Sequence, residues 1–363
     1  MKVLHAAETI KGGVATVMKQ ICIDQVDQDG IENVYCIVPD SQRNELYPYN
    51  NEIITFKSKK RSILSFFRFF YCFILSVIKF KPDVVHLHST FAGFLGRVAL
   101  LIISPIIKPK VIYCPHAFSF VMSSSNTKRK FFGYIEKILA VHTDVIICVS
   151  EYEKKCALEQ GLANEKLCVI HNGVPAHVDV KINDNPYDNS VLNILFVGRL
   201  DYQKGFDILL RAIDIMGELP FTLTVIGNAV HDNVNESEFN GKIRYLGWVE
   251  QEKISKFYAF SDVVIMPSRW EGFAMVALES MRFSSPVIAS NNSSFPEVIV
   301  DGVTGILFDE GDHQALADIL MKVNKRDLKI MGNKANKLFL DNFTADKMLR
   351  KTHDVYVLLS KEL

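Results

Sequence analysis

Two glutamates eight residues apart, Glu271 and Glu279, are the residues whose type and spacing best suit chemistry. The segment from Asp262 to Met266 has the composition of a short buried strand, and Pro267 ends it. The apolar run from Phe273 to Met281 has helical spacing. These patterns predict a helix that starts just after Glu271, with Glu279 about two turns further along nearly the same face.

The start of this predicted helix is a candidate anion site made of backbone. Its first turn would present the N–H groups around Ala274, Met275 and Val276, backed by the positive end of the helix dipole. A diphosphate held there would be flanked by carboxylates that accept hydrogen bonds from hydroxyl groups. The alternative for this segment is plainer: Glu271 is an acid favoured by the dipole, and Glu279 is a solvated helix residue.

The composition indicates a folded chain of two domains. A length of 363 residues exceeds one ordinary core, and 48% hydrophobic with 23% charged residues is typical of globular proteins. The seven cysteines are odd in number and widely spaced, with no Cys-x-x-Cys pair, which favours a reducing cytosol over disulfides or a structural zinc. Met1 leads directly into a strand-like segment, so no secretion signal is expected.

The net charge of zero conceals an asymmetry along the chain. Counting Lys and Arg against Asp and Glu, residues 1–172 carry +6, residues 173–363 carry −6, and residues 51–140 alone carry +11. A basic first half and an acidic second half indicate different surfaces and partners rather than a particular fold.

Strands and helices alternate regularly along both halves, which predicts parallel sheets wound on both faces. The polar stretch 180–190 is the best candidate for a linker, and residues 344–359 form a last amphipathic helix. We therefore expect domains at 1–175 and 190–342, with a C-terminal helical segment at 343–363. The expected strands are 2–6, 33–38, 82–88, 110–114, 144–149 and 167–170 in the first half, and 192–197, 222–226, 243–246, 262–266, 286–290 and 305–308 in the second.

Ligands bind such sheets at the carboxyl ends of the strands, and several chemistry-bearing residues follow predicted strands. Each alone is weak evidence, because loops after strands are rich in glycine and charge. Asp27-Gln-Asp29 resembles a cation-binding Asp-x-Asp pair, but it lies in a polar run and is predicted to be a solvated loop. The residues that follow strands are Gly12, Gly13, His116, Arg199, Lys204, Gly227 and Glu271.

A basic and apolar stretch in the first half suggests contact with a membrane surface. Residues 57–61 are mostly basic, and residues 63–79 are mostly apolar. Arg68 makes a membrane-spanning helix costly, and a second apolar segment at 91–107 is likewise interrupted by charge. Both segments could simply be core helices. We favour an amphipathic helix that is partly core and partly interfacial beside a polybasic patch.

With these motifs in place, the sequence resembles the retaining GT-B glycosyltransferases of family 4. The resemblance implies two Rossmann-like, doubly wound domains with a cleft between them and a C-terminal helix that crosses back to the first domain. Small departures are Ala117 and Ala274, where many members have Gly. Ala274 would tighten the pocket around the donor sugar, so the identity of that sugar stays open. The matching pieces cover almost the whole chain in order: Gly12-Gly13, Pro82–His88, His116, Asn172-Gly173-Val174, Gly198-Arg199-Leu200, Lys204-Gly205, Glu271-Gly272-Phe273 with Glu279, and Asp301–Gly305.

By resemblance, Arg199 and Lys204 hold the diphosphate of a nucleotide-sugar, where two cations replace the metal that other folds use. Glu271 would contact the hydroxyls of the donor sugar and Glu279 those of the ribose. The remaining substrate-binding positions in this half would be Gly227, Phe273, Ala274, Met275 and Val276.

In the first domain, the resemblance places His116 against the donor sugar, where it would help to stabilise charge as the bond to the diphosphate loosens. Gly12 and Gly13 would give close backbone approach to the diphosphate or the acceptor. The anomeric configuration would be retained by attack of the acceptor hydroxyl on the face that the diphosphate leaves, with a phosphate oxygen taking the proton.

The expected activity is transfer of a hexose from a nucleotide-sugar, UDP-sugar favoured over GDP-sugar, to a lipid-linked glycan in O-antigen, capsule or exopolysaccharide synthesis. The enzyme would need no metal and no cofactor, bind no nucleic acid, and work at the inner face of the plasma membrane as a peripheral protein on an anionic surface. Two alternatives stay open: a soluble small-molecule acceptor with the same donor chemistry, and a non-catalytic sugar-nucleotide-binding protein.

Overall fold

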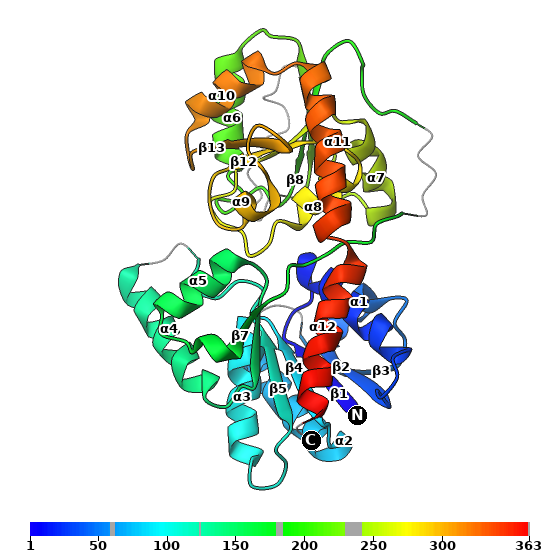
Figure 1. Ribbon diagram of the computed structural model, residues 1–363, viewed down its shortest axis with the longest axis vertical. Helices are drawn as coiled ribbons and strands as arrows, with labels where there is room; N and C mark the ends of the chain where they lie inside the picture. The colour runs from blue at the N-terminus through cyan, green and yellow to red at the C-terminus, as the bar shows by residue number, and fades with distance from the viewer. Residues whose placement is uncertain (59–61, 123–124, 179–183, 229–241, 362–363) are drawn as a thin grey trace. The chain divides into compact units, whose positions relative to one another are not determined.

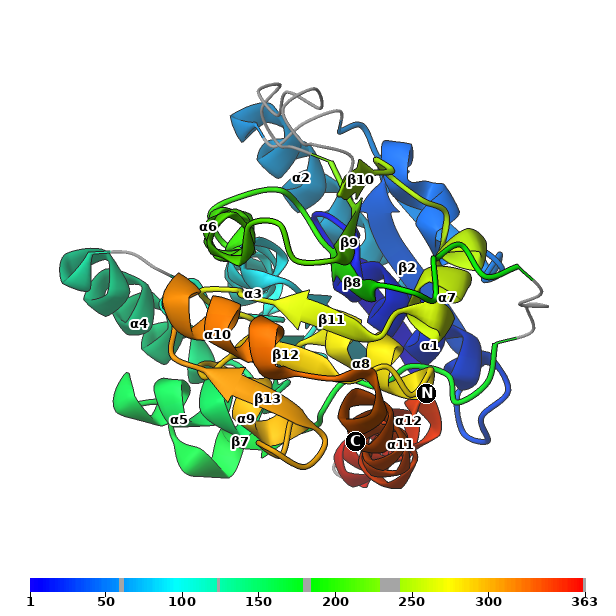
Figure 2. The same cartoon turned by 90° about the horizontal axis from the view of Figure 1, so that it is seen from above.

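A computed structural model describes residues 1–58, 62–122, 125–178, 184–228 and 242–361 (Figures 1 and 2). The chain divides into two compact units. Unit 1 contains Met1–Asn172 and Ala345–Leu363, and unit 2 is Gly173–Thr344. Parts of the predicted basic run (59–61) and of the predicted linker (180–183) lie outside the described residues.

Unit 1 is built on a seven-stranded parallel sheet with the order β3-β2-β1-β4-β5-β6-β7. Strands β2 and β3 lie on one side of β1, and strands β4 to β7 follow in order on its other side. This reversal creates the switch point beside which ligands bind in doubly wound sheets. The strands are β1 (Lys2–Ala7), β2 (Asn33–Pro39), β3 (Glu52–Phe56), β4 (Val84–His88), β5 (Lys110–Cys114), β6 (Val145–Cys148) and β7 (Leu167–Val169).

Helices cover both faces of this sheet. One face packs against α2, α3 and α4 through a core that includes Leu4, Leu87 and Phe73, and the other packs against α1. The last helix, α12, belongs to unit 1 and packs beside α1 (Figure 1). The helices are α1 (Gly13–Val26), α2 (Ile63–Phe80), α3 (Thr90–Ile103), α4 (Asn126–Ala140), α5 (Glu151–Glu159) and α12 (Ala345–Ser360), with short 3-10 turns at η1 (Asp40–Leu46) and η2 (Asn164–Lys166).

Unit 2 repeats the same plan with a six-stranded parallel sheet in the order β10-β9-β8-β11-β12-β13. Helices α6 and α10 pack together over one face, while α7, α8 and α11 pack together on unit 2 as well. The strands are β8 (Leu192–Val197), β9 (Phe221–Ile226), β10 (Ile243–Tyr245), β11 (Val263–Met266), β12 (Val287–Ser290) and β13 (Gly305–Phe308). The helices are α6 (Phe206–Met216), α7 (Gln251–Phe260), α8 (Met275–Arg282), α9 (Phe295–Val298), α10 (His313–Lys322) and α11 (Lys325–Asn342).

The two charged residues noted within apolar segments of the first half have different environments. Arg97 of α3 is fully buried, and its guanidinium pairs with Glu136 of α4 at 2.7 Å and lies over the Tyr113 ring at 4.0 Å. A buried cation is tolerated because it is paired and hydrogen-bonded. Arg68 of α2 is exposed instead. Thus α3 is a core helix whose charge is neutralised inside the unit, while α2 keeps one face outward.

The predicted fold class is confirmed, whereas some element boundaries differ. The sequence did not predict β3 or η1. Both lie in a mostly polar segment that contains only a short run of apolar residues. Helix α3 ends at Ile103 rather than at 107, because Pro105 cannot continue it. The prediction of a helix starting directly after Glu271 was wrong, because α8 begins at Met275 with Ala274 as its N-cap.

Candidate functional site

The topology of unit 2 brings its candidate residues to one edge of the sheet. Arg199 and Lys204 follow β8, and Glu271 follows β11. These two strands are neighbours at the point where the strand order reverses. The residues therefore meet where a doubly wound sheet places its ligand.

Lys204 and Glu271 form a direct ion pair in the structure. The Lys204 Nζ lies 2.6 Å from Glu271 Oε1, and the Ser268 hydroxyl donates to the same oxygen at 2.8 Å. The side chains of Lys204 and Glu271 are 18% and 7% exposed. The sequence placed both residues at the site but gave no sign that they pair, because 67 positions separate them. A diphosphate and the Glu271 carboxylate would compete for one ammonium group.

Arg199 is the more accessible cation. Its side chain is 55% exposed, and it bonds Asp201 at 3.0 Å and Gln203 at 2.6 Å, both within its own loop. Asp201 also accepts a hydrogen bond from the Lys204 backbone N–H at 3.0 Å. This local network holds the loop between β8 and α6 in one shape, with a guanidinium still open to an anion.

A second arginine, Arg269, fixes the loop that carries Glu271. Its guanidinium makes two hydrogen bonds of 2.8 Å to the Asp207 carboxylate at the start of α6 and lies 3.7 Å from the Tyr202 ring centroid. The bidentate bond to Arg269 lowers the pKa of Asp207. The sequence analysis did not single out Arg269. Its position two residues before Glu271 was the available signal.

Two glycines allow loops at this edge of the sheet to approach closely: the β9 loop approaches the β8 loop, and the β8 loop approaches the β11 loop. A Cβ at Gly227, whose φ is +143°, would lie 1.8 Å from the Gly198 carbonyl oxygen. A Cβ at Gly205, with φ +65°, would lie 1.9 Å from the Pro267 carbonyl oxygen. Only glycine fits either position, so Gly227 has a structural reason for its identity.

The helix start after Glu271 differs from the predicted anion site in one respect. The N–H of Met275 donates to the Phe273 carbonyl at 2.9 Å, so this amide already has a partner. Both Phe273 and Ala274 are buried. Further along α8, Glu279 accepts a hydrogen bond from the Tyr258 hydroxyl at 2.8 Å, and burial raises the pKa of its carboxyl.

In unit 1, His116 lies just after β5 on a strained loop. His116 and Ala117 have φ values of +54° and +122°, a region that disfavours residues with a Cβ. The Glu153 carboxylate accepts hydrogen bonds from the backbone N–H groups of Phe118 at 3.1 Å and Val149 at 2.8 Å. Glu153 thus anchors the His116 loop, a role that the sequence analysis missed. The geometry also explains why glycine suits position 117.

Gly12 and Gly13 also fall at the carboxyl edge of their sheet. Gly12 is the N-cap of α1, with φ +60°, and Gly13 is the first residue of that helix. Nearby in the fold, the Ser89 hydroxyl after β4 donates to Glu8 after β1 at 3.0 Å, and both side chains are buried. Glu8 is a carboxylate at the switch point of unit 1 that sequence reasoning did not single out.

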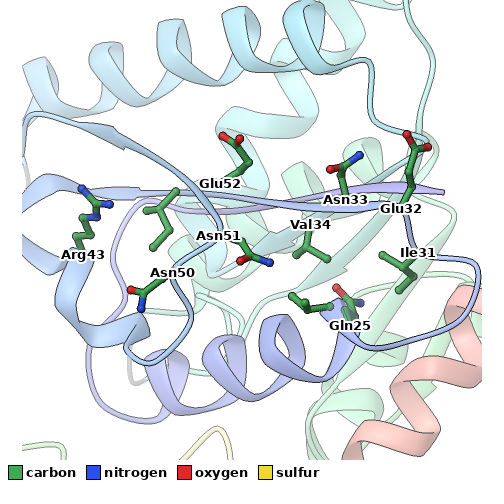
Figure 3. A pocket seen from close by; sticks show the side chains of 11 residues that line it. Gln25, Ile31, Glu32, Asn33, Val34, Arg43, Asn50, Asn51 and Glu52 are labelled. Atoms are coloured by element: carbon green, nitrogen blue, oxygen red, sulfur yellow. The ribbon is translucent and has the colours of Figure 1, made fainter.

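A cavity of about 480 Å³ lies elsewhere on unit 1 (Figure 3). Residues at the amino ends of β2 and β3, among them Asn33 and Glu52, line it together with Arg43 and the end of α1. This is the edge opposite to the one expected to bind ligands, so the cavity is distinct from the candidate site. Among the described residues, His5, His86 and His88 bring ring nitrogens within 4.8 Å of one another, the spacing of a possible metal site.

Two Rossmann-like units with cationic and acidic residues at the carboxyl ends of their strands define a glycosyltransferase of the GT-B class. The chain belongs to glycosyltransferase family 4: residues 11–178 match the model described as Glycosyltransferase Family 4, and residues 179–356 match that of Glycosyl transferases group 1.

Relatives of this chain match most of its length. An uncharacterized 41.2 kDa protein in the cps region of Klebsiella pneumoniae is 40% identical over 328 residues, which are 88% of this chain and 89% of the relative. The UDP-Gal:alpha-D-GlcNAc-diphosphoundecaprenol alpha-1,3-galactosyltransferase of Escherichia coli is 27% identical over 299 residues, 77% of this chain and 76% of the relative. The solved sucrose-phosphate synthase of Thermosynechococcus elongatus has a TM-score of 0.85 at 17% identity, covering 100% of both chains.

Proposed function

We propose that the protein is a retaining, metal-independent hexosyltransferase that moves a sugar from a UDP-sugar to a lipid-linked glycan in cell-surface polysaccharide synthesis. The observation that carries the proposal is the group of Arg199, Lys204 and Glu271 at the switch point of unit 2. Two cations beside an acid suit a diphosphate that carries a hydroxyl-rich sugar. The E. coli relative, whose name states a UDP-Gal donor and a diphosphoundecaprenol acceptor, supports the choice of both substrates.

In the proposed reaction, Arg199 and Lys204 neutralise the leaving diphosphate, the part that a metal ion plays elsewhere. Glu271 accepts hydrogen bonds from hydroxyls of the donor sugar. For unit 1, the family resemblance assigns contact with the donor sugar to His116 and close backbone approach to Gly12 and Gly13. The acceptor oxygen forms a bond to the anomeric carbon as the bond to the diphosphate breaks on the same face, and the acceptor proton passes to a phosphate oxygen.

The donor is identified by thermal stabilisation followed by turnover. We expect UDP and UDP-hexoses to raise the melting temperature more than GDP-sugars do, since a ligand stabilises the folded state according to its affinity. Arg199→Gln should abolish both this shift and sugar transfer. Arg326→Gln, an exposed arginine of α11, is the matched control and should change neither. Unchanged turnover in Arg199→Gln would refute the diphosphate role.

An exposed apolar stripe on α2 supports membrane association. By length and composition α2 could cross a membrane, with a mean hydropathy of 1.8, but Phe69, Phe73 and Val77 pack into the core of unit 1. Its opposite face leaves large apolar side chains in solvent at helical spacing, with Phe67 and Tyr71 68% and 67% exposed. An amphipathic helix of this kind suits an interface rather than a span. The exposed apolar residues are Ile63, Leu64, Phe67, Tyr71, Leu75 and Ile78.

Helix α4 on the same sheet face repeats this pattern with a stronger positive charge. Phe131, Tyr134 and Ile138 are exposed at helical spacing, and Lys128 and Lys130 are exposed in the first turns. Basic side chains beside exposed aromatics favour an anionic lipid surface. A lipid-linked acceptor would be presented at such a surface.

Sedimentation with liposomes distinguishes this acceptor class from a soluble one. We expect the chain to sediment with vesicles containing phosphatidylglycerol and less with neutral vesicles. The Phe67→Ser, Tyr71→Ser double variant should stay in the supernatant, while Ile330→Ser, Leu340→Ser on α11 should behave as wild type. A wild-type chain that remained in the supernatant with anionic vesicles would favour the soluble small-molecule acceptor.

A further inference from the structure

A row of hydrogen-bonded imidazoles runs beneath His116 in unit 1. His5 and His86 are paired in register on β1 and β4, and His88 follows on the same face of β4. His5 Nε2 contacts Gln25 Oε1 of α1 at 2.7 Å, His5 Nδ1 contacts His88 Nε2 at 3.0 Å, and His88 Nδ1 contacts His116 Nε2 at 3.2 Å. The row is therefore continuous from Gln25 to His116.

Burial favours the uncharged form of each imidazole in the row. His5 and His88 are fully buried, and His116 is half-buried. Burial lowers the pKa of His5 and of His116 to about 4 and lowers the pKa of His88 well below its usual range, because a charged ring would lose its hydration beside other rings. A neutral imidazole has one N–H donor and one acceptor nitrogen.

This chemistry leaves the row only two arrangements of its protons, all pointing toward Gln25 or all pointing away. In the structure the Gln25 carbonyl oxygen faces His5, and an oxygen can only accept. His5 then carries its proton on Nε2, His88 must donate from Nε2 to His5, and His116 must donate from Nε2 to His88. The Nδ1 of His116 is left as an acceptor nitrogen.

A second neighbour of Gln25, Tyr356 of α12, is compatible with this orientation of the amide. The Tyr356 hydroxyl contacts His86 Nδ1 at 2.8 Å; burial raises the pKa of this hydroxyl, and an interaction with Gln25 acts in the opposite direction. With its oxygen on His5, the amide of Gln25 has its nitrogen left as the donor for a second partner. Gln25 is 3% exposed.

We propose that Gln25 and His88 are positioning residues that fix the tautomer of His116, through an unbroken row of hydrogen bonds, so that its Nδ1 acts as a neutral hydrogen-bond acceptor. The tautomer of a histidine is set by the bond that its other ring nitrogen makes. The catalytic consequence rests on the proposed function, because an acceptor nitrogen suits a donor-sugar hydroxyl and the positive charge that develops at the anomeric carbon. The protonation pattern itself is independent of that function.

The first test observes the protons directly, without any assay of activity. The full chain is labelled with ¹⁵N-histidine, and each ring is assigned from single His variants. We expect His5, His88 and His116 to be protonated on Nε2 at neutral pH, with ¹⁵N–¹⁵N couplings across the two N–H···N bonds. A His116 proton on Nδ1, or rings without these couplings, would overturn the proposal.

The same spectra test the role of Gln25 and the competing metal site. Gln25→Met removes the terminal acceptor and should weaken the preference for one tautomer along the row, whereas Gln25→Glu keeps an acceptor and should preserve it. One equivalent of zinc in the purified chain, with loss of the proton shared by His5 and His88, would show that the cluster with His86 binds a metal instead and would overturn the proposal.

The second test measures turnover with a matched control. His88→Phe breaks the row, while His86→Phe removes a ring of equal burial that is stacked 4.1 Å from His88 but lies outside the row. We expect kcat to fall about ten- to a hundredfold in His88→Phe with little change in the donor KM, by analogy with the hydrogen-bond partners that orient metal-ligating histidines, and to stay near wild type in His86→Phe. Equal effects of the two substitutions, or none in His88→Phe, would contradict the positioning role. If no variant or wild type turns over any donor, the proposed function fails while the spectra still decide the row.

Discussion

Replacing Lys204 should destabilise unit 2 more than replacing Lys204 and Glu271 together. In Lys204→Met the Glu271 carboxylate, 7% exposed, keeps only the Ser268 hydroxyl among the contacts described above. Removing one partner of a buried ion pair costs about 3–5 kcal/mol. We expect about 3 kcal/mol, because Lys204 is partly exposed and the hydroxyl still bonds the acid. The double variant Lys204→Met, Glu271→Gln leaves no buried charge and should lose only about 1 kcal/mol, the worth of an ordinary hydrogen bond.

The chain contains a natural probe for this measurement. Both of its tryptophans, Trp248 and Trp270, belong to unit 2, so urea unfolding followed by tryptophan fluorescence reports that unit. A difference of about 2 kcal/mol between the single and double variants corresponds to a midpoint shift on the order of 1 M urea. Glu271→Gln completes the double-mutant cycle.

Ligand binding separates the stability effect from the proposed role of the cation. Wild type should gain about 2.7 kcal/mol of stability at a UDP concentration one hundred times its Kd. Both variants that lack Lys204 should lose most of this gain, although the double variant is nearly as stable as wild type. A double variant that is less stable than Lys204→Met would refute the reasoning, since it would show that the pair contributes more than the uncompensated acid costs.

Three further predictions concern the loops that carry the site. Gly227→Ala places a Cβ against a backbone carbonyl and should cost several kcal/mol by tryptophan fluorescence, whereas Gly217→Ala, with φ +56° and open space around its Cβ, should cost less because only backbone strain opposes it. Ala117→Gly should stabilise unit 1 by about 1 kcal/mol by relieving a φ of +122°, measured by labelling the seven cysteines, all of which lie in unit 1. Burial raises the pKa of Glu153 from 4.5 to about 7, so the folded state binds this proton more tightly and the stability from this group is lost as pH rises from about 4.5 to 7, by about 3 kcal/mol. Glu153→Gln should remove that part of the pH dependence in the same labelling assay, and an unchanged profile would show that Glu153 is not the titrating group.

The sequence predicted the fold well because its signals are local. Alternation of strand and helix, and glycine or charge just after each strand, placed Arg199, Lys204 and Glu271 on one edge of a sheet without knowledge of their distances. The predicted start of α8 failed because a local turn decides it: Ala274 has the φ and ψ of an inverse γ-turn, and the 2.9 Å bond from the Met275 N–H to the Phe273 carbonyl delays the start of the helix.

Side-chain partnerships could not be predicted, because they join residues far apart along the chain. Glu153 lies 35 positions from the Phe118 amide that it accepts from, and Lys204 lies 67 positions from Glu271. No periodicity or motif encodes such pairs. The motif Pro82–His88 was recognised as a strand carrying two histidines, but only the register with β1 and the side-chain contacts show that His88 links His116 to His5 and Gln25.

Under the proposed function, the candidate residues of the two units would meet the charge of the reaction in different ways. Unit 2 offers charged groups, and its buried Glu271 carboxylate is neutralised by Lys204 at 2.6 Å. A buried carboxylate is stable there only while a cation or a hydrogen-bond donor faces it. Unit 1 offers His116, and burial lowers the pKa of this imidazole to about 4, which favours its neutral form near pH 7. A cationic imidazole would repel the positive charge that develops at the anomeric carbon, whereas a neutral acceptor stabilises it. Under the proposed function, protonation of His116 should therefore not reduce turnover as pH falls from 7 to 5.5. A loss of kcat with an apparent pKa near 6.5 that disappears in His116→Asn would show that the imidazole is not held neutral.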